Sequence, residues 1–430
     1  MIKYIVWGLG YEGKWFIHEM NSEEIAYIID NNSVYKGEKW NGIPILSWNE
    51  YTKMGEDYPI VVSAIRHWDE IYNLLLEAGY KTVYSYAEIW IQRKLGQLTY
   101  RQDDIFLMNI HSYTNAGDYA ITYAEEKFLR DYFTERRVLK IPSFICRDAL
   151  DKIDPYIKDE NVILISGGGY LGNLWMECGE ENVRAIIRHF SKNKIVVLPQ
   201  SLYFTNDNIG QIEKEKSAKV YTEHSNLCIC LRDEKSFLKK NEMKRYEFVE
   251  WVLIPDMVLY MAQFSELMNN RCDITICFRN DKENNGADIK TSMVQFLEKT
   301  FRKIKYMSME TVEIIGTEEA KKAFDEKLQI LKKSKLVITD RLHCMILCAI
   351  SGTPCLALDN VSGKVEGGYA WISYLEYIQF AKNEKNWKEK ILYLYNINHD
   401  CIYNNYEFVK RYARLEEIIR REKGKDGKIQ

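Results

Sequence analysis

The sequence predicts an α/β protein with parallel sheets, and three observations support this fold class. Short apolar segments of strand length alternate with helical segments along nearly the whole chain, a pattern typical of βαβ units. Several of these strands run directly into glycine-rich or polar turns that open a helix. The chain has 430 residues, which at roughly 150 residues per domain corresponds to two or three domains.

The bulk composition is that of an ordinary soluble protein. Hydrophobic residues make up 46% of the chain, and 59 Lys and Arg face 62 Asp and Glu, so bulk charge offers no support for nucleic-acid binding. No apolar run approaches the ~20 residues that span a bilayer. The opening MIKYIVWGLG enters a strand and a glycine turn, which is unlike a signal peptide. The ten cysteines form no CxxC pair, which argues against zinc and for reduced thiols in a cytoplasmic protein.

Residues 1–92 are predicted to form a small Rossmann-like unit. Gly8, Gly10 and Gly13 match the G-x-G-x-x-G spacing directly after a strand, and Asp30 ends the next strand. In a nucleotide site such glycines admit a pyrophosphate to the helix N-terminus and the acid binds a ribose hydroxyl. Alternatively, the glycines serve only helix–strand packing. The segment resembles the small Rossmann-like domain attached to several sugar-modifying enzymes, where it binds a nucleotide, binds nothing known or serves docking. The predicted strands are KYIVWG, IAYIIDNN, PIVVSAI and KTVYSY.

A polar linker at residues 93–103 separates this unit from two further α/β series. Residues 104–250 contain the strands IFLMNI, RRVLKI, NVILIS, KIVVLPQ and NLCICLRD. Residues 251–420 contain CDITICFRND, KIKYMS, KLVITD and PCLALD; the last ~60 residues read as amphipathic helix, with a frayed tail at 421–430. Two α/β halves with a C-terminal helix match a glycosyltransferase-B-like architecture, a pair of Rossmann-like domains with the active site in the cleft between them.

The most informative stretch is KLVITDRLHCMILCAISGTPCLALDN, residues 335–360. A buried strand runs into Asp340, Arg341 and His343, an apolar helix follows, and a second strand completes a βαβ unit. Ligands of open α/β sheets bind at the carboxyl ends of strands, and helix N-termini attract anions. A fixed cation and an imidazole at this place predict chemistry on a phosphate or carboxylate. The alternative is that Asp340 caps the helix, Arg341 pairs with a neighbour and His343 is a core histidine.

The turn after IFLMNI offers a second candidate. Asn115, Gly117 and Asp118 precede a helix. Asp118 either caps that helix by accepting backbone N–H bonds or faces the cleft as a base.

The turn after NVILIS holds Gly167, Gly168 and Gly169. Three successive glycines are costly in conformational entropy, and a plain turn needs fewer, so we expect a loop whose backbone approaches a ligand. Gln200 and Ser201 end the strand KIVVLPQ and suit a polar acceptor.

Charged pairs end two further strands. Arg232 and Asp233 end NLCICLRD; Arg232 could grip a carboxylate or phosphate in bidentate fashion, or the two could form a surface pair of little worth. Arg279, Asp281 and Glu283 repeat the pattern after CDITICFRND, and there the sequence favours neither interpretation.

Taken together, NxGDxAI, SGGGxLG, PQS, LRDxxS, TDRLHxxIL and LDNxxGK resemble the polysaccharide pyruvyl transferase family over residues 104–380. Members place the three-carbon unit of phosphoenolpyruvate on a sugar, usually as a ketal bridging two hydroxyls. The resemblance implies a glycosyltransferase-B-like fold, with catalysis by Arg341 and His343 beside Asp118. The residues assigned to phosphoenolpyruvate are Arg232, Arg341, Leu342, His343 and Lys364. The residues assigned to the acceptor and its loop are Asn115, Gly117, Gly167, Gly168, Gly169, Gln200, Ser201 and Asn360.

One departure from the family concerns the acceptor. Many members follow the Gln-Ser pair with a Gly-Pro turn, where this chain has Leu202, Tyr203 and Phe204. An aromatic surface beside the acceptor leaves its identity open.

The expected chemistry needs no cofactor, although an Asp with phosphate could recruit a divalent cation. The expected partners are phosphoenolpyruvate and a saccharide or lipid-linked glycan of a capsule or exopolysaccharide. We expect a cytoplasmic location, with peripheral association at the inner membrane face and with assembly enzymes as an option. Two alternatives stay open: a nucleotide-sugar-dependent glycosyltransferase and a non-catalytic capsule-assembly scaffold.

Overall fold

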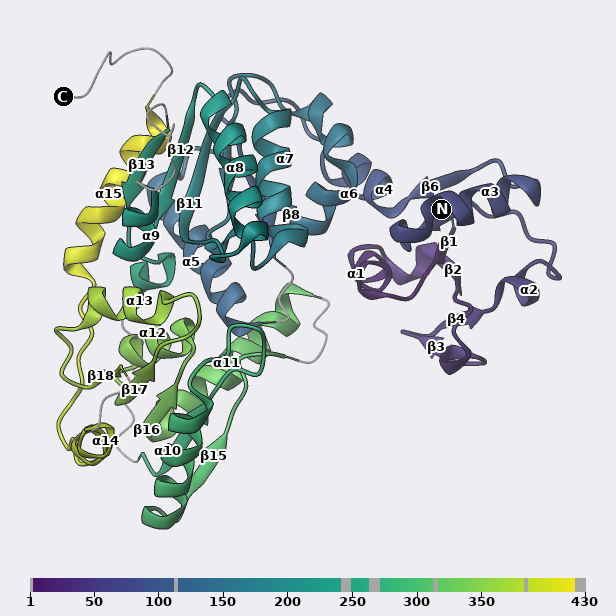
Figure 1. Ribbon diagram of the computed structural model, residues 1–430. Helices are drawn as coiled ribbons and strands as arrows, with labels where there is room; N and C mark the ends of the chain where they lie inside the picture. The colour runs from purple at the N-terminus through teal and green to yellow at the C-terminus, as the bar shows by residue number, and fades with distance from the viewer. Residues whose placement is uncertain are drawn as a thin grey trace. The chain divides into compact units, whose positions relative to one another are not determined.

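The computed structural model describes residues 3–111, 115–240, 249–262, 271–311, 316–382 and 386–421, and the chain forms two compact units (Figure 1). The N-terminal unit comprises Met1–Arg101, Phe144–Lys158 and Glu313–Ala320. The main unit comprises Gln102–Ser143, Asp159–Val312 and Lys321–Gln430. The predicted tail begins at Arg421, and its residues 422–430 lie outside the described residues. The predicted domain boundaries stay predictions.

The N-terminal unit is built on one six-stranded sheet with the strand order β3-β4-β2-β1-β5-β6. All neighbours are parallel except the β3–β4 hairpin, which the sequence analysis missed. The strands are β1 Tyr4–Trp7, β2 Ile25–Ile29, β3 Lys39–Trp40, β4 Ile43–Leu46, β5 Ile60–Val62 and β6 Val83–Ser85. The helices are α1 Tyr11–Glu19, α2 Trp48–Tyr51, α3 Trp68–Glu77 and α4 Tyr86–Lys94, the last ending inside the predicted linker.

A segment from much later in the chain completes this unit. Helix α6 (Ser143–Ile153) brings Phe144 against Trp15, with ring centroids 4.6 Å apart. The Tyr86 hydroxyl donates a hydrogen bond of 2.7 Å to Asp148 Oδ2. The N-terminal unit is therefore not formed by the first hundred residues alone.

The main unit contains two parallel sheets, one in each of two halves. The sheet of the first half has the order β13-β12-β11-β9-β7-β8, with β10 paired to β11, and that of the second half is β15-β14-β16-β17-β18. In the first half the strands are β7 Ile105–Ile110, β8 Val138–Pro142, β9 Val162–Ile165, β10 Gly168–Gly172, β11 Lys194–Tyr203, β12 Leu227–Leu231 and β13 Glu250–Leu253. In the second half they are β14 Asp273–Cys277, β15 Ile304–Tyr306, β16 Ser334–Thr339, β17 Cys355–Leu358 and β18 Ile378–Ala381.

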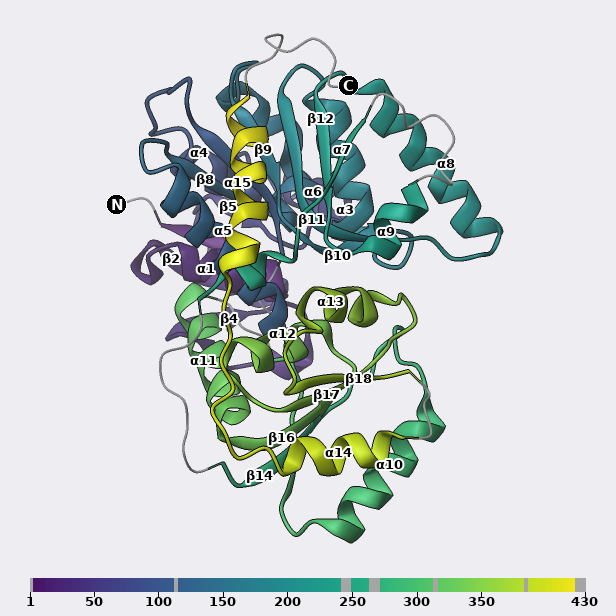
Figure 2. The ribbon, with the colours of Figure 1, turned by 90° about the vertical axis from the view of Figure 1, so that its left-hand side faces the viewer.

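Helices cover both sheets, which explains why strands such as β7 and β9 are buried throughout. In the first half these are α5 Ala116–Tyr132, α7 Glu181–His189, α8 Asn208–Glu223 and α9 Glu234–Lys239. In the second half they are α10 Ala287–Thr300, α11 Thr317–Lys333, α12 Leu342–Ile350, α13 Lys364–Ile372 and α14 Trp387–Tyr395. The last helix, α15 Tyr406–Arg420, returns to the first half, where Tyr412 donates to the backbone of Asp256 and Arg421 pairs with Glu250 of β13 (Figures 1 and 2).

The topology confirms the predicted fold class, a glycosyltransferase-B-like pair of Rossmann-like halves preceded by a small parallel α/β unit. In both halves the first strand lies between the second and the third, β7 between β8 and β9 and β14 between β15 and β16. Such a reversal of strand order opens a crevice beyond the carboxyl ends of the strands. Each half therefore contributes one switch point to a shared site.

Two local predictions are wrong. The glycines 167–169 were expected to form a loop, but Gly168–Gly172 form strand β10, whose Gly168 pairs with Gln200 of β11. Glycine is required because a Cβ at Gly172 would overlap the carbonyl of Tyr203. The last ~60 residues were expected to be amphipathic helix, but they also contain strand β18 before the helices α14 and α15.

Candidate active site

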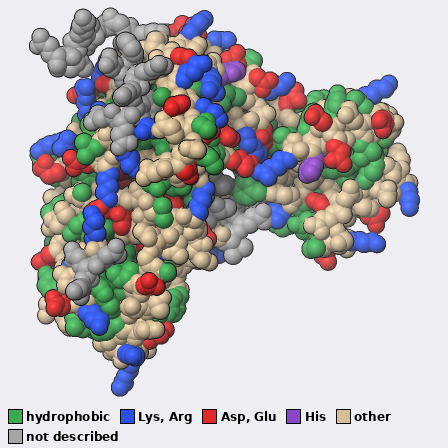
Figure 3. All heavy atoms as spheres, in the orientation of Figure 1, with side chains coloured by type: hydrophobic (Ala, Val, Ile, Leu, Met, Phe, Trp, Pro, Cys, Tyr) green, Lys and Arg blue, Asp and Glu red, His purple; other side chains and the backbone are tan. Residues whose placement is uncertain are grey.

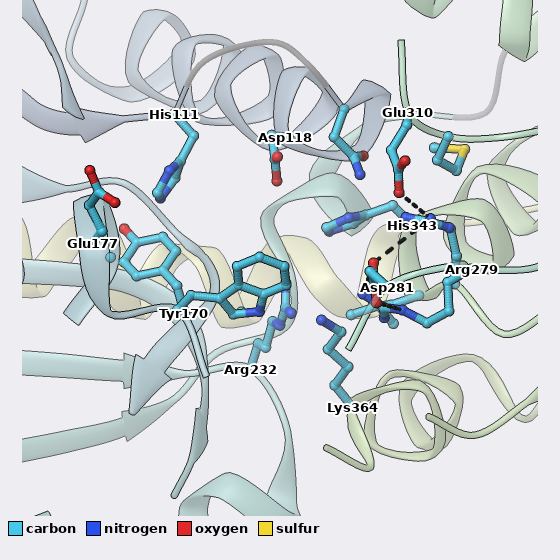
Figure 4. A pocket seen from close by; sticks show the side chains of 17 residues that line it. His111, Asp118, Tyr170, Glu177, Arg232, Arg279, Asp281, Glu310, His343 and Lys364 are labelled. Atoms are coloured by element: carbon cyan, nitrogen blue, oxygen red, sulfur yellow. Dashed lines mark hydrogen bonds and ion pairs between the residues drawn. The ribbon is translucent and has the colours of Figure 1, made fainter. Parts of the chain in front are cut away.

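A pocket of about 440 Å³ lies at the two switch points of the main unit (Figure 4). This volume is typical of a small-molecule site. Of the predicted residues, those that line it are Asn115, Asp118, Gly169, Arg232, Arg341, Leu342, His343 and Lys364. The predicted residues that do not are Gly117, Gly167, Gly168, Gln200, Ser201 and Asn360.

Arg341 and His343 reach the same pocket although they are only two positions apart. Arg341 is the N-cap of α12 and keeps an extended backbone, with φ −107° and ψ 122°, while His343 sits in the first helical turn. This change of conformation, rather than helical periodicity, aims both side chains into the pocket. Gly117 is needed on the opposite side, since a Cβ there would overlap the His343 imidazole.

The Arg341 guanidinium is only partly satisfied. One terminal nitrogen lies 2.6 Å from Glu310 Oε1 and 3.9 Å from Asp281 Oδ2. Its Nε is buried and has no hydrogen-bond partner among the described residues. An ionised, buried N–H without a partner is expensive, and a bound anion would remove that cost.

Asp256 joins the predicted arginine and histidine into one charged group. Arg232 donates to Asp256 Oδ2 at 2.7 Å, and His343 Nε2 lies 3.4 Å from the same oxygen. Burial opposes ionisation of this carboxyl, but Arg232 and His343 outweigh burial and hold the pKa of Asp256 well below its usual range. The carboxylate is thus ionised and placed to hold an imidazolium.

Lys364 is held by a buried carboxylate. Its Nζ lies 2.6 Å from Glu283 Oε2, which also pairs with Arg279 at 2.6 Å. Burial lowers the pKa of Lys364 to about 8, against the opposing charge of Glu283. Asn360 donates to Glu283 at 2.8 Å and Trp175 donates to it at 2.9 Å. Asn360 therefore positions Glu283 and, through it, the cations of the pocket.

The glycine segment, residues 167–169, is held in place by the buried carboxyl of Glu125. Glu125 on α5 accepts from the Gly167 backbone at 2.6 Å and from the Ser166 hydroxyl at 2.8 Å. Burial raises the pKa of Glu125 to about 8. A Cβ on Gly169 would come within 2.8 Å of the Arg232 guanidinium, so the absence of a side chain lets strand β10 pass beside that arginine.

Gln200 and Ser201 bond to protein groups inside the first half. Gln200 donates to the Ser166 carbonyl at 2.9 Å. Ser201 donates to Asp233 Oδ2 at 2.8 Å and accepts from Arg232 Nε at 2.9 Å. Both residues thus position the glycine segment and Arg232.

Asn115, not Asp118, caps helix α5. The Asn115 side chain accepts from the Gly117 backbone at 2.8 Å. The capping interpretation of Asp118 is therefore wrong, and its side chain lines the pocket near His111 and His343 (Figure 4).

The sequence analysis missed several residues of the site, namely His111 and Glu310, which line the pocket, and Asp256, which contacts Arg232 and His343 behind it. His111 directly follows β7, Asp256 follows β13 by three positions, and Glu310 follows β15 by four. The rule that ligands gather at strand ends would have found His111; Asp256 escaped it because β13 was not predicted. The other lining residues that it missed are Tyr170, Trp175, Glu177, Gly179 and Met309.

The glycine turn of the N-terminal unit is a different case. Asp30 accepts from the backbone N–H groups of Leu9 and Asn32, both at 2.8 Å. A Cβ at Gly13 would overlap the carbonyl of Gly8, whereas Gly10 has open space around it. Packing explains Gly13, and nucleotide binding at this turn stays a prediction.

Comparison with known proteins identifies the family of this chain. Residues 115–362 match the family of polysaccharide pyruvyl transferases. General stress protein 30 of Bacillus subtilis is 34% identical over 67% of this chain and 84% of its own length. Pyruvyl transferase 1 of Schizosaccharomyces pombe is 24% identical over 60% of this chain and 66% of its own length. A functionally uncharacterised protein of Klebsiella pneumoniae, 17% identical, covers 69% of this chain and 96% of its own, with a TM-score of 0.44.

The family match defines an enzyme of the transferase class. The chain belongs to the polysaccharide pyruvyl transferase family and is a transferase. Within the described ranges, no three or more His, Cys, Asp and Glu side chains are grouped to hold a metal ion. In the same ranges, no helix is long and apolar enough to cross a membrane. Lys, Arg, Asp and Glu are interspersed on the face seen in Figure 3.

Proposed function

We propose that this enzyme takes phosphoenolpyruvate as donor and forms a pyruvate ketal on hydroxyls of a cell-surface saccharide or its lipid-linked precursor. One observation carries the proposal. Arg341 Nε is buried in the pocket without a hydrogen-bond partner in the described part of the chain, and beside it His343 Nε2 faces the ionised Asp256 at 3.4 Å. A donor that offers an anionic oxygen to Arg341 and a carbon that can take a proton from His343 would use both residues.

The charge of the pocket suits a small dianionic group beside a carboxylate. The fixed or titratable cations that line it are Arg232, Arg279, Arg341 and Lys364. A carboxylate already lies against Arg341, because Glu310 reaches it at 2.6 Å with a side chain that is 54% exposed. Glu310 is the solvent-exposed partner of that ion pair, so an incoming phosphate or carboxylate can replace it at modest cost.

The residues divide the chemistry as follows. His343, held by ionised Asp256, protonates C3 of phosphoenolpyruvate, which makes C2 electrophilic. Arg341 and Arg232 stabilise the phosphate as its bond to C2 breaks. The two acceptor hydroxyls lose one proton each; one ends in the new methyl group and the other on the released inorganic phosphate. Leu342 contributes an apolar wall. Lys364 has a pKa of about 8 and can donate a hydrogen bond to the phosphate as it leaves.

The experiment compares donors directly. The purified protein is incubated with phosphoenolpyruvate and a panel of p-nitrophenyl hexosides, and inorganic phosphate and product mass are measured. We expect phosphate release and a mass increase for a ketal. A nucleotide-sugar-dependent glycosyltransferase would instead be protected from unfolding by nucleotide sugars only, and a scaffold by neither donor.

A matched assay with and without a chelator tests the expected independence from cofactors. We propose that the arginines do the work of a metal, so turnover should survive EDTA. Loss of turnover that Mg²⁺ restores would show that a divalent cation takes part.

A further inference from the structure

His111 supplies a third buried polar atom that has no partner. Among the described residues that line the pocket, three side-chain atoms are buried without a hydrogen-bond partner: Arg341 Nε, His343 Nε2 and His111 Nε2. The donor chemistry proposed above uses the first two. The third belongs to the first half of the main unit and stays unused.

The imidazole of His111 is fixed at the other end of the pocket. His111 directly follows β7, and its ring meets the ring of Tyr170 edge-on, with centroids 4.4 Å apart and an interplanar angle of 64°. Tyr170 is itself held, since its hydroxyl donates to the Ser166 carbonyl. Figure 4 shows His111 beside Tyr170, with Asp118 between it and His343. A ligand that reaches from His343 to His111 would therefore pass Asp118.

Burial decides the ionisation of His111. It lowers the pKa of this imidazole, and the nearby Asp118 only partly opposes the shift. Near neutral pH the ring is therefore uncharged and carries one nitrogen lone pair, as a proton acceptor requires. His343 differs in its surroundings, because its Nε2 lies 3.4 Å from the ionised carboxylate of Asp256.

The residues around His111 suit a saccharide better than an anion. Tyr170 brings an aromatic ring against His111, and Trp175 and Glu177 add a second aromatic ring and a carboxylate to the lining of the same pocket. The Trp175 indole is fixed by its 2.9 Å hydrogen bond to Glu283, yet the residue remains 37% exposed. A rigid aromatic ring with a polar tip next to hydrogen-bonding groups can pack against the apolar face of a sugar ring and orient its hydroxyls.

We propose that His111 is the general base for the acceptor hydroxyl, in a saccharide subsite formed with Tyr170, Trp175 and Glu177. This inference rests on the proposed function. The first acceptor O–H bond breaks, its proton passes to His111 Nε2, and the oxygen bonds to C2 while C3 takes a proton from His343. The C2–O bond to phosphate then breaks, and the second hydroxyl bonds to C2. Its proton returns to His343, and the proton on His111 leaves with the inorganic phosphate.

The test uses the full chain and the variants His111→Gln and His111→Ala. Phosphate release from phosphoenolpyruvate is measured with the p-nitrophenyl hexoside panel; this readout counts transfer to a hexoside and to water alike. We expect the rate to fall by a factor of ~10²–10⁴, the usual contribution of a general base. Phosphoenolpyruvate should bind both variants as it binds the wild type, and added imidazole should restore part of the rate of His111→Ala. His67→Gln, an exposed histidine of the N-terminal unit, is the control and should keep the full rate.

Three results would overturn the assignment. They are a wild-type rate in folded His111→Gln, a loss of phosphoenolpyruvate binding that parallels the loss of rate, and a His111→Ala rate that imidazole does not restore. A wild-type enzyme that releases no phosphate from phosphoenolpyruvate would instead contradict the proposed function itself, which separates the two failures.

Discussion

The N-terminal unit and the main unit share one feature of parallel sheets, and in the main unit that feature forms part of a charged pocket. Both place polar residues where parallel strands end at a reversal of strand order. In the N-terminal unit, Asp30 is satisfied by two backbone N–H groups, and Ser63 donates to the carbonyl of Gly8 at 2.9 Å. In the main unit, the charged Arg341 keeps a buried Nε without a partner in the ranges that the structure describes. Buried polar atoms without a partner among the described residues also occur away from the pocket, at Trp40 and Trp90. The difference teaches that such an atom marks a ligand site where it is charged and lines a pocket, as Arg341 Nε does.

The largest effect is expected at His343. His343→Ala should reduce pyruvyl transfer by a factor of ~10²–10⁴, because a general acid–base is lost. Binding of phosphoenolpyruvate should be partly retained, since the arginines remain. The measurement is phosphate release, with a separate binding titration. His399→Ala, an exposed histidine paired with Glu376, is the control; equal rates in both variants would make His343 a packing residue.

The second-largest effect is expected from substitutions of Arg341. Both Arg341→Ala and Arg341→Lys should cost ~2–4 kcal/mol of transition-state stabilisation. Lys fails because it lacks the forked guanidinium and, with it, the buried Nε–H. The quantity to compare is kcat/KM for phosphoenolpyruvate, with Arg414→Lys on the surface of α15 as the matched change. Full activity in Arg341→Lys would remove bidentate anion binding from the mechanism.

Glu125 should make stability depend on pH. Its carboxyl is predominantly protonated in the folded protein below about pH 8, whereas the unfolded chain loses the proton near pH 4.5. The folded state therefore gains stability below pH 4.5 and loses it as pH rises through 8. Glu125→Gln imitates the protonated form, so the free energy of unfolding should fall less between pH 5.5 and 8.5, by at least about 2 kcal/mol. Urea titrations of both proteins measure this, and parallel pH profiles would contradict it.

The smallest effect is expected in the N-terminal unit. Asp30→Ala should leave pyruvyl transfer unchanged and should lower the stability of that unit by about 1 kcal/mol, since two backbone N–H groups lose their acceptor. Transfer assays and thermal unfolding measure the two quantities. Titration with NAD tests whether the glycine turn binds a nucleotide instead. Tight binding that Asp30→Ala weakens would make the glycine turn a nucleotide site and would break the contrast between the two units.

Much of the fold and part of the site followed from the sequence. The βαβ alternation predicted the parallel sheets, because buried parallel strands are continuous apolar runs and need crossover helices. Arg232, Arg341, His343 and Lys364 were identified from motifs, and all four line the pocket. Strand β13 was missed because it is short and only partly buried, and with it Asp256, the carboxylate that joins Arg232 to His343.

The sequence by itself determined much of the local geometry of this protein: the long apolar strands, the helices that follow them and the charged residues at those strand ends. It did not reveal β3, β4, β10, β13 or β18. Tertiary structure alone decided which of those residues have a partner. Gln200, Ser201 and Asn360 turned out to bond to protein groups, while His111, which no motif marked, kept a buried nitrogen without a partner among the described residues. The physical reason is that hydrogen-bond satisfaction depends on groups 30 to 80 positions apart in the chain, and only folding brings such groups within 3 Å of each other.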